Sequence, residues 1–222
     1  MEGVFVTGTD TGVGKTTFCA GLLKLIQGTY KVRYWKPVQT GTIIGDDTNV
    51  IKELTQLNAD FFVQPAYRFP DPVSPHMAAK KWGQEVDLET LKKAYTAAKA
   101  TTDFMIVEGA GGLLVPLNDR VLQIDLIKAI GLPLLVVAED RVGAINQTLL
   151  TLNAARAVGI EILGVVLTKT RKNLGNAEPI AQFGKVEILA EFDPSEDSRN
   201  VIAQVGGHEG LRKLFNVKSL PA

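Results

Sequence analysis

The sequence predicts an α/β domain in which helices cover both faces of a mostly parallel β-sheet. Short apolar runs alternate with longer segments of helical period along the chain, as expected for parallel strands joined by right-handed helical crossovers. Several of these runs are apolar throughout, which is typical of strands buried on both faces. No linker, repeat or low-complexity tract divides the 222 residues, so we expect residues 1–222 to form a single domain.

Strands and helices are expected to alternate from the N-terminus onward. Strands are predicted at residues 4–7, 32–35, 104–107, 132–138 and 162–167, with a weaker one at 186–189. Helices are predicted near residues 15–27, 46–57, 87–100, 121–130, 143–158 and 207–216. Ligands of such sheets bind beyond the carboxyl ends of the strands, so polar residues that follow strands are the candidates for a site.

Composition and charge exclude several classes of protein. Hydrophobic residues make up 45% of the chain and charged residues 22%, which is typical of a globular protein and not of a disordered or fibrous one. Lys+Arg and Asp+Glu both total 24, and this balance gives no support to a nucleic-acid or membrane partner. The N-terminus lacks a signal-like segment, and no run approaches the ~18 apolar residues of a membrane span. We therefore expect a cytoplasmic protein whose one cysteine, Cys19, is buried on the apolar face of the first helix.

A complete phosphate-loop motif follows the first predicted strand. Residues 8–16, GTDTGVGKT, fit the pattern G-x-x-x-x-G-K-[ST], and an amphipathic helix comes directly after them. The glycines let backbone N–H groups turn toward phosphate oxygens, which the start of the helix also attracts. Lys15 supplies charge for the outer phosphates, and the Thr16 hydroxyl can ligate Mg²⁺. The sequence therefore predicts a P-loop NTPase-like domain. Its expected nucleotide-binding residues in this loop are Gly12, Val13, Gly14, Lys15, Thr16 and Thr17.

Other polar residues follow predicted strands and would lie beside this loop. The run at 104–107 ends in Glu108, followed by a glycine turn that lets the backbone approach a nucleotide closely. Beside a phosphate loop, we interpret Glu108 as a second magnesium ligand. Asp46 and Asp47 come at the start of a predicted helix, and their spacing leaves helix capping and metal binding equally open. Lys36 ends the second predicted strand, and its spacing alone leaves open whether it faces the phosphate loop or the solvent.

Several segments together resemble the dethiobiotin synthetase family, in the same order and at matching distances. They are GTDTGVGKT at 8–16, KPVQTG at 36–41, PVSPH at 72–76, EGAGG at 108–112 and GAIN at 143–146. Each motif alone occurs in other P-loop proteins, whereas the lysine segment and the SPH segment together are specific. The resemblance covers residues 1–168 and thins beyond them.

The resemblance implies an ATP- and Mg²⁺-dependent ring closure in biotin biosynthesis. The family's substrate, 7,8-diaminopelargonic acid, takes up CO₂ on one amine to give a carbamate, which attacks the γ-phosphate of ATP. The second amine then closes the ring to dethiobiotin, and ADP and phosphate are released. Carbamate and triphosphate are both anions, so the site needs fixed positive charge and a metal. The family resemblance also implies a homodimer with the active site at the subunit interface.

The resemblance assigns roles to residues of this chain. The expected catalytic residues are Lys36, Lys15 and Thr11. The expected magnesium ligands are Thr16, Asp47 and Glu108, which favours Asp47 over Asp46. Further nucleotide contacts are expected at Gly109, Ala110, Gly111, Thr168, Lys169, Ile188, Leu189 and Ala190. Substrate contacts are expected at Thr40 and at Gly143, Ala144, Ile145 and Asn146, where the N–H groups of a helix start suit the substrate's tail carboxylate.

The chain departs from the family pattern at two positions. The family often has an acid in the phosphate loop where this chain has Gly12. It also commonly has an asparagine after the fifth strand that reads adenine, where this chain has Thr168, so we expect other nucleoside triphosphates to compete unusually well with ATP. For the two histidines, we expect a structural role for His76 and an exposed side chain for His208.

Three other functions of P-loop proteins fit this sequence less well. An ATP-dependent amidase of the cobyrinate type needs a glutaminase domain with a nucleophilic cysteine, and this chain has only Cys19. A regulatory nucleotide switch of the partitioning-ATPase kind carries an additional lysine early in the loop, where this chain has Asp10, Thr11 and Gly12. A regulatory domain that binds nucleotide without turnover is the main alternative, and the intact Lys15 and the other catalytic and metal positions argue against it.

Overall fold

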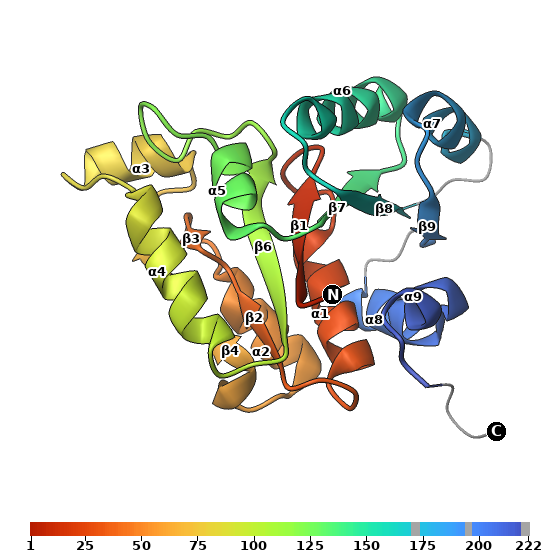
Figure 1. Ribbon diagram of the computed structural model, residues 1–222, viewed down its shortest axis with the longest axis horizontal. Coiled ribbons are helices and arrows are strands. Elements are labelled where there is room, and N and C mark those ends of the chain that lie inside the picture. Colours follow the sequence, from red (N-terminus) through yellow and green to blue (C-terminus); the bar gives the residue numbers. More distant parts are fainter. Residues whose placement is uncertain (170–173, 194–196, 219–222) are drawn as a thin grey trace.

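A parallel β-sheet forms the centre of the molecule (Figure 1). This computed structural model describes residues 1–169, 174–193 and 197–218. Within them, seven strands form one sheet in the order β4-β2-β6-β1-β7-β8-β9, and every pairing is parallel. The strands are β1 (Gly3–Gly8), β2 (Val32–Trp35), β4 (Phe62–Val63), β6 (Phe104–Gly112), β7 (Leu134–Glu139), β8 (Ile162–Thr168) and β9 (Ile188–Glu191). Two short strands, β3 (Val38–Gln39) and β5 (Tyr67–Arg68), pair separately.

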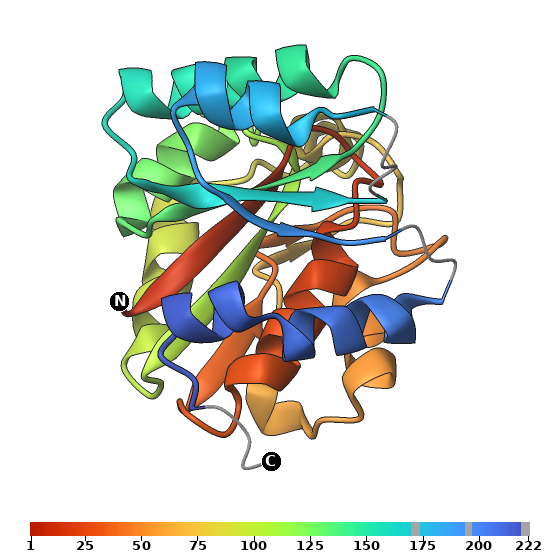
Figure 2. The ribbon, with the colours of Figure 1, turned by 90° about the vertical axis from the view of Figure 1, so that its right-hand side faces the viewer.

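Helices cover both faces of the sheet and bury a separate apolar core on each (Figure 2). One core contains side chains of α1 (Lys15–Ile26), α2 (Asp47–Thr55), α8 (Ser198–Gly207) and α9 (Glu209–Leu214). The other contains side chains of α3 (Pro75–Lys81), α4 (Leu88–Lys99), α5 (Gln123–Ile130), α6 (Ala144–Ala157) and α7 (Ala177–Gly184). A short 3₁₀ helix, η1 (Ala59–Phe61), precedes β4. No helix in the described parts of the chain is long and apolar enough to cross a bilayer.

The predicted fold class is confirmed, and each of the predicted strands and helices is present with its ends shifted by a few residues. The largest shift is in β6, which continues through the glycine turn to Gly112 where the apolar run predicted an end at residue 107. Among the described residues, the structure adds the helices α3, α7 and α8, the 3₁₀ helix η1 and the two-residue strands β3, β4 and β5, which the apolar pattern did not predict. α3 and α7 are only seven and eight residues long, shorter than the window of about 11–18 residues in which a helical period is read, and α8 ends in Gly206 and Gly207, which are poor helix formers.

Strand order brings distant segments to one edge of the sheet. β6 lies between β2 and β1, with Tyr34 opposite Ile106 and Val6 opposite Glu108. Since all three strands are parallel, the residues that follow β1 and β2 lie beside the last residues of β6. The phosphate loop, Lys36 and Glu108 therefore meet at the carboxyl edge.

Candidate nucleotide-binding site

The phosphate loop wraps tightly between β1 and α1. Gly12 and Gly14 have φ angles of 72° and 94°, in the left-handed region that glycine adopts without strain. A Cβ on Gly8 would lie 2.7 Å from the Asp10 carbonyl oxygen and 2.8 Å from Lys15 Nζ, so this position must also be glycine. Lys15 Nζ donates to the Asp10 carbonyl at 2.9 Å. The lysine thus lies over its own loop, where a phosphate would meet it.

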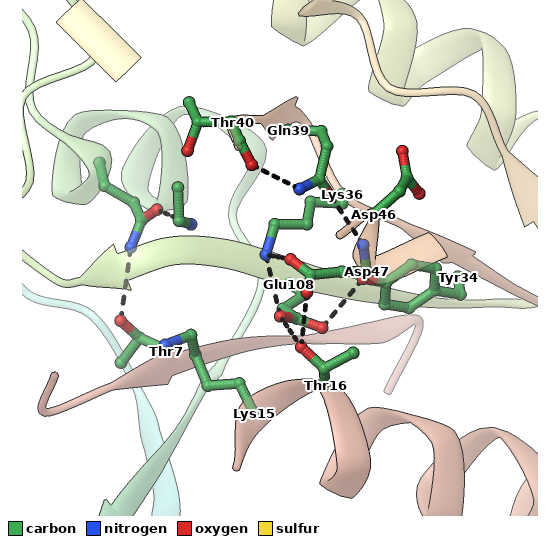
Figure 3. A network of polar contacts seen from close by, with 12 residues as sticks. Thr7, Lys15, Thr16, Tyr34, Lys36, Gln39, Thr40, Asp46, Asp47 and Glu108 are labelled. Carbon is green, nitrogen blue, oxygen red and sulfur yellow. Dashed lines mark hydrogen bonds and ion pairs between the residues drawn. The ribbon is translucent and has the colours of Figure 1, made fainter. Parts of the chain in front are cut away.

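A compact polar cluster lies beside this loop (Figure 3). Lys36 forms ion pairs with Asp47 and, at 3.0 Å, with Glu108 Oε1. The Thr16 hydroxyl lies 2.9 Å from Glu108 Oε1 and 3.2 Å from Asp47 Oδ1. Four separate elements or their ends, α1, α2, β2 and β6, supply these side chains. The structure thus brings together the three expected magnesium ligands and the expected catalytic lysine.

Burial and nearby charge shift the pKa of Lys36 in opposite directions. The side chain is almost fully buried, and Glu108 is completely buried. Burial alone lowers the pKa of Lys36, but the negative charges of Glu108 and Asp47 outweigh it, so its pKa is raised overall. For Lys15 burial is the largest influence and lowers its pKa, while the charge of Glu108 opposes the change. Lys36 is therefore a firmly charged buried cation and not a surface lysine.

The two neighbouring aspartates have different roles in the structure. Asp46 is the N-cap of α2, with Oδ1 accepting the Asn49 N–H at 3.0 Å, and its other oxygen lies 2.7 Å from the Arg68 guanidinium. Asp47 instead turns toward Thr16 and Lys36. The spacing alone left helix capping and metal binding equally open at this pair, and the contacts separate them.

A cavity of about 730 Å³ extends from the phosphate loop past this cluster. This volume lies within the range of small-molecule sites. Of the predicted site residues, those lining it are Thr11, Gly12, Gly14, Lys15, Thr16, Thr17, Lys36, Thr40, Asp47, Glu108, Ala110 and Gly111. Its remaining wall includes Ser74 and Pro75 of the SPH segment.

The residues expected near the base lie outside this cavity. The Thr168 hydroxyl is buried and lies 2.7 Å from the Val13 carbonyl oxygen and 3.3 Å from that of Ala138. A hydroxyl has a single proton to donate, and Thr168 donates it to the backbone of the phosphate loop. It therefore has no hydrogen-bond donor left for a base. Lys169 pairs with Glu139 at 3.2 Å. The side chains of Leu189 and Ala190 are buried in the core, so these two residues can offer a nucleotide only their backbone, whereas Ile188 is half-buried.

The start of α6 also lies outside the cavity of its own chain. Gly143 and Asn146 are exposed, Ile145 is half-buried and Ala144 is buried. Just before them, Arg141 Nη2 lies 3.3 Å from Asp10 Oδ2, which ties this helix to the phosphate loop. The structure therefore does not bring residues 143–146 together with Lys36 inside one subunit.

Sequence reasoning missed two residues that hold the site. The Tyr34 hydroxyl donates to Glu108 Oε2 at 2.9 Å. Gln123 accepts the Ala110 N–H at 2.6 Å and donates to the Gly112 carbonyl at 2.9 Å, which fixes the glycine turn. Tyr34 could have been found, since it lies two residues before Lys36 and strand residues two apart face the same side. Gln123 gave no comparable signal.

The histidines lie apart from this cluster. His76 Nδ1 is 3.0 Å from Ser74 Oγ at the start of α3. The expectation that His208 is exposed is wrong. It is half-buried, its Nδ1 accepts the Leu211 N–H at 3.4 Å, and its ring packs edge-on to Phe192. Capping α9 draws this side chain inward.

Comparisons with known proteins agree with the motif pattern. The family model described as an AAA domain matches residues 2–201. The ATP-dependent dethiobiotin synthetase of Paramagnetospirillum magneticum is 41% identical over 87% of this chain and 89% of its own length. That of Lawsonia intracellularis is 36% identical over 96% of this chain and 98% of its own length.

Solved structures of lower identity share the fold alone. The MinD cell division protein of Aquifex aeolicus has a TM-score of 0.63 at 18% identity, covering 100% of this chain and 99% of that one. A ParA family ATPase from Chlorobium tepidum has a TM-score of 0.58 at 14% identity, covering 96% of this chain and 93% of that one. The two dethiobiotin synthetases are instead 36% and 41% identical over 96% and 87% of this chain. The chain therefore belongs to the dethiobiotin synthetase family.

Proposed function

We propose that this protein is an ATP-dependent cyclo-ligase that converts 7,8-diaminopelargonic acid and CO₂ to dethiobiotin, with ATP cleaved to ADP and phosphate. The observation that carries the proposal is the buried Lys36 held between Asp47 and Glu108 at the end of a complete phosphate loop. Ring closure through a carbamate requires two anions to approach one another, and fixed cations in a partly enclosed cavity lower that barrier. A cytoplasmic location is part of this proposal, because the reaction uses ATP.

Each cation has a task in this reaction. Lys15 and the backbone N–H groups of the loop bind the β- and γ-phosphates. Lys36 stabilises charge where carbamate and γ-phosphate meet, and Thr11 and Thr40 line the same cavity and contact the reacting groups. Electrostatic stabilisation of this kind is expected to supply most of the rate enhancement.

The residues present fit a magnesium ion. Thr16, Asp47 and Glu108 offer only hard oxygen donors, which suit Mg²⁺ better than zinc, and their oxygens already converge within hydrogen-bond distance. Within the described residues no group of three or more His, Cys, Asp or Glu side chains could hold a metal, so the hydroxyl and the nucleotide's phosphates would complete the ligand set. Bound Mg²⁺ would neutralise phosphate charge during transfer.

The proposed active unit is a homodimer. The cavity beside the phosphate loop lacks residues 143–146 of its own chain, and a second copy can supply the N–H groups of this helix start to the substrate's tail carboxylate. Exposed apolar side chains support a contact there. Leu114 and Leu150 line a 450 Å³ hollow next to the phosphate loop, and Val142 is 84% exposed. Exposed apolar groups of this kind favour association.

Product analysis tests the proposal directly. The protein is incubated with diaminopelargonate, bicarbonate, Mg²⁺ and ATP, and the product is identified by mass spectrometry. Dethiobiotin carrying one carbon from labelled bicarbonate is the expected result. Tight ATP binding or slow hydrolysis without any dethiobiotin would instead support the regulatory nucleotide-binding alternative.

A further inference from the structure

We propose that Tyr34 is a positioning residue that orients the Glu108 carboxylate toward the metal side of the site, an inference that rests on the proposed function. The Tyr34 hydroxyl donates to Glu108 Oε2 at 2.9 Å, and both side chains have no exposed surface. Figure 3 shows Tyr34 reaching Glu108 from the side away from Lys15. The hydroxyl is thus buried behind the ligand and does not touch the reacting groups.

Strand register explains how Tyr34 reaches this position. Tyr34 pairs with Ile106 across the parallel β2–β6 ladder, two residues before Glu108. Residues two apart in an extended segment face the same side, so Tyr34 on β2 and Lys36 just after its end share the face of Ile106 and Glu108 on β6. This face packs against α1, where Thr16 lies. The long phenol side chain therefore reaches the Oε2 atom of Glu108, whereas Lys36 contacts Oε1.

The two oxygens of Glu108 have different partners. Oε1 accepts from Thr16 at 2.9 Å and from Lys36 at 3.0 Å, whereas Oε2 accepts from Tyr34. The Cys19 thiol also lies within hydrogen-bond reach of this carboxylate, but a thiol is a weak donor. Tyr34 therefore holds one oxygen in the protein interior and leaves the other directed at Thr16 and Lys36.

The direction of this hydrogen bond is fixed by chemistry. An ionised carboxylate only accepts, so the phenol must donate. The ring itself is anchored in the apolar core, edge-on to Phe62 at a centroid distance of 6.3 Å. A rigid donor on a ligand's distant oxygen is how proteins set the geometry of a metal site.

The test compares two variants that each lose one phenolic hydroxyl. Tyr34→Phe keeps the ring and removes the donor to Glu108. Tyr30→Phe is the matched control, because the Tyr30 hydroxyl donates to the Phe215 carbonyl at 3.1 Å, away from the site. Mn²⁺ binding in the presence of ADP is titrated by electron paramagnetic resonance, and ADP binding in EDTA is titrated by calorimetry. Thermal melts report the stability of both variants.

Tyr34→Phe is expected to weaken Mn²⁺ binding about 10- to 100-fold, the usual effect of removing a partner of a metal ligand. ADP affinity in EDTA should stay within about twofold of wild type, because the phosphate loop is untouched, and Tyr30→Phe should bind Mn²⁺ normally. Unchanged Mn²⁺ affinity in Tyr34→Phe overturns the inference, and so does an equal loss of metal-free ADP binding, which would indicate general damage to the site. Dethiobiotin formation by the wild type is measured separately, so failure of the proposed function is distinguishable from failure of this inference.

Discussion

Lys36 is the residue on which the proposed chemistry depends most. Lys36→Ala is expected to lower turnover by roughly 10²–10³ or more, because the charge opposite the transferring phosphoryl group is lost. The variant also leaves Asp47 and Glu108 facing one another without a cation, and breaking a buried ion pair in this way costs about 3–5 kcal/mol of stability. Steady-state kinetics and thermal melts measure the two effects.

Lys92 provides the control for that substitution. Its exposed ammonium pairs with Glu89 on the same helix face, and such surface pairs contribute about 0–1 kcal/mol. Lys92→Ala should therefore be active and nearly as stable as wild type. Near-normal turnover in Lys36→Ala would show that Lys36 has only a structural role.

The metal assignment predicts a simple dependence on divalent cations. EDTA should abolish dethiobiotin formation, and added Mg²⁺ should restore it, because Thr16, Asp47 and Glu108 provide only hard oxygen donors. Activity is measured across a series of free Mg²⁺ concentrations. Full activity in a metal-free preparation would contradict the assignment of all three ligands together.

Thr168 bears on the choice of nucleotide. Its hydroxyl is committed to the Val13 and Ala138 carbonyls, so base contacts fall to the backbone around residues 188–190. We expect ATP to be preferred over CTP, GTP and UTP by less than about a thousandfold in kcat/KM, or ~4 kcal/mol. Steady-state kinetics with the four nucleotides at fixed diamine test this. A larger preference would show that another residue reads the adenine edge.

At the scale of elements, α4 illustrates how a cap links helix stability to pH. The Asp87 side chain accepts the Thr90 N–H at 2.9 Å and the Thr90 hydroxyl at 2.7 Å, and these bonds, the hydroxyl first, lower the pKa of Asp87. Asp87→Ala should lower the melting temperature by about 2–4 °C, and Asp87→Asn, which keeps an acceptor, by less.

The stability that the Asp87 charge contributes should fall as the pH is lowered. Because the pKa of Asp87 is lower in the folded protein, its charged form adds stability above the unfolded value of about 3.9. This contribution is lost as the pH falls through the lower folded value. Melts of wild type and Asp87→Asn should therefore differ more at neutral pH than near pH 3. An equal difference at both pH values would contradict a role for the charge.

At the scale of the whole molecule, the dimer proposal makes a test by complementation possible. Lys36→Ala inactivates one part of each site, and Asn146→Asp places a negative charge where the substrate's tail carboxylate should bind. Asn146 is chosen because it is exposed, whereas Ala144 is buried and its substitution would disturb α6. Mixing the two inactive chains should restore up to about a quarter of wild-type activity, since half of the dimers are mixed and each contains one intact site.

Light scattering provides the second measurement for the assembly. The active species should have the mass of a dimer, and each single variant should remain dimeric. A monomer that makes dethiobiotin at the full rate would rule out a site shared between subunits.

The fold class, the phosphate loop and the strands around it could be predicted from the amino-acid sequence. These depend on local patterns, since strand composition, helix period and the glycines of GTDTGVGKT are all read from neighbouring residues. α3 was not predicted because its seven residues are too few to show a helical period, and α8 was not predicted because it ends in two glycines, which disfavour a helix. The base region was also only partly predictable, since the side chain of Thr168 contacts the phosphate loop, and this contact depends on how the end of β8 packs against that loop.

The contacts between side chains from distant segments became known from the three-dimensional fold. Thr16 and Glu108 are 92 residues apart in the sequence, and Tyr34 and Glu108 are 74 apart, yet they hydrogen bond because β6 lies between β2 and β1. The same packing turned Asp47 inward while Asp46 capped α2, and it directed Thr168 to the phosphate loop. Local spacing cannot determine such contacts, because they depend on strand order and register, which are set by the burial of both faces of the sheet at once.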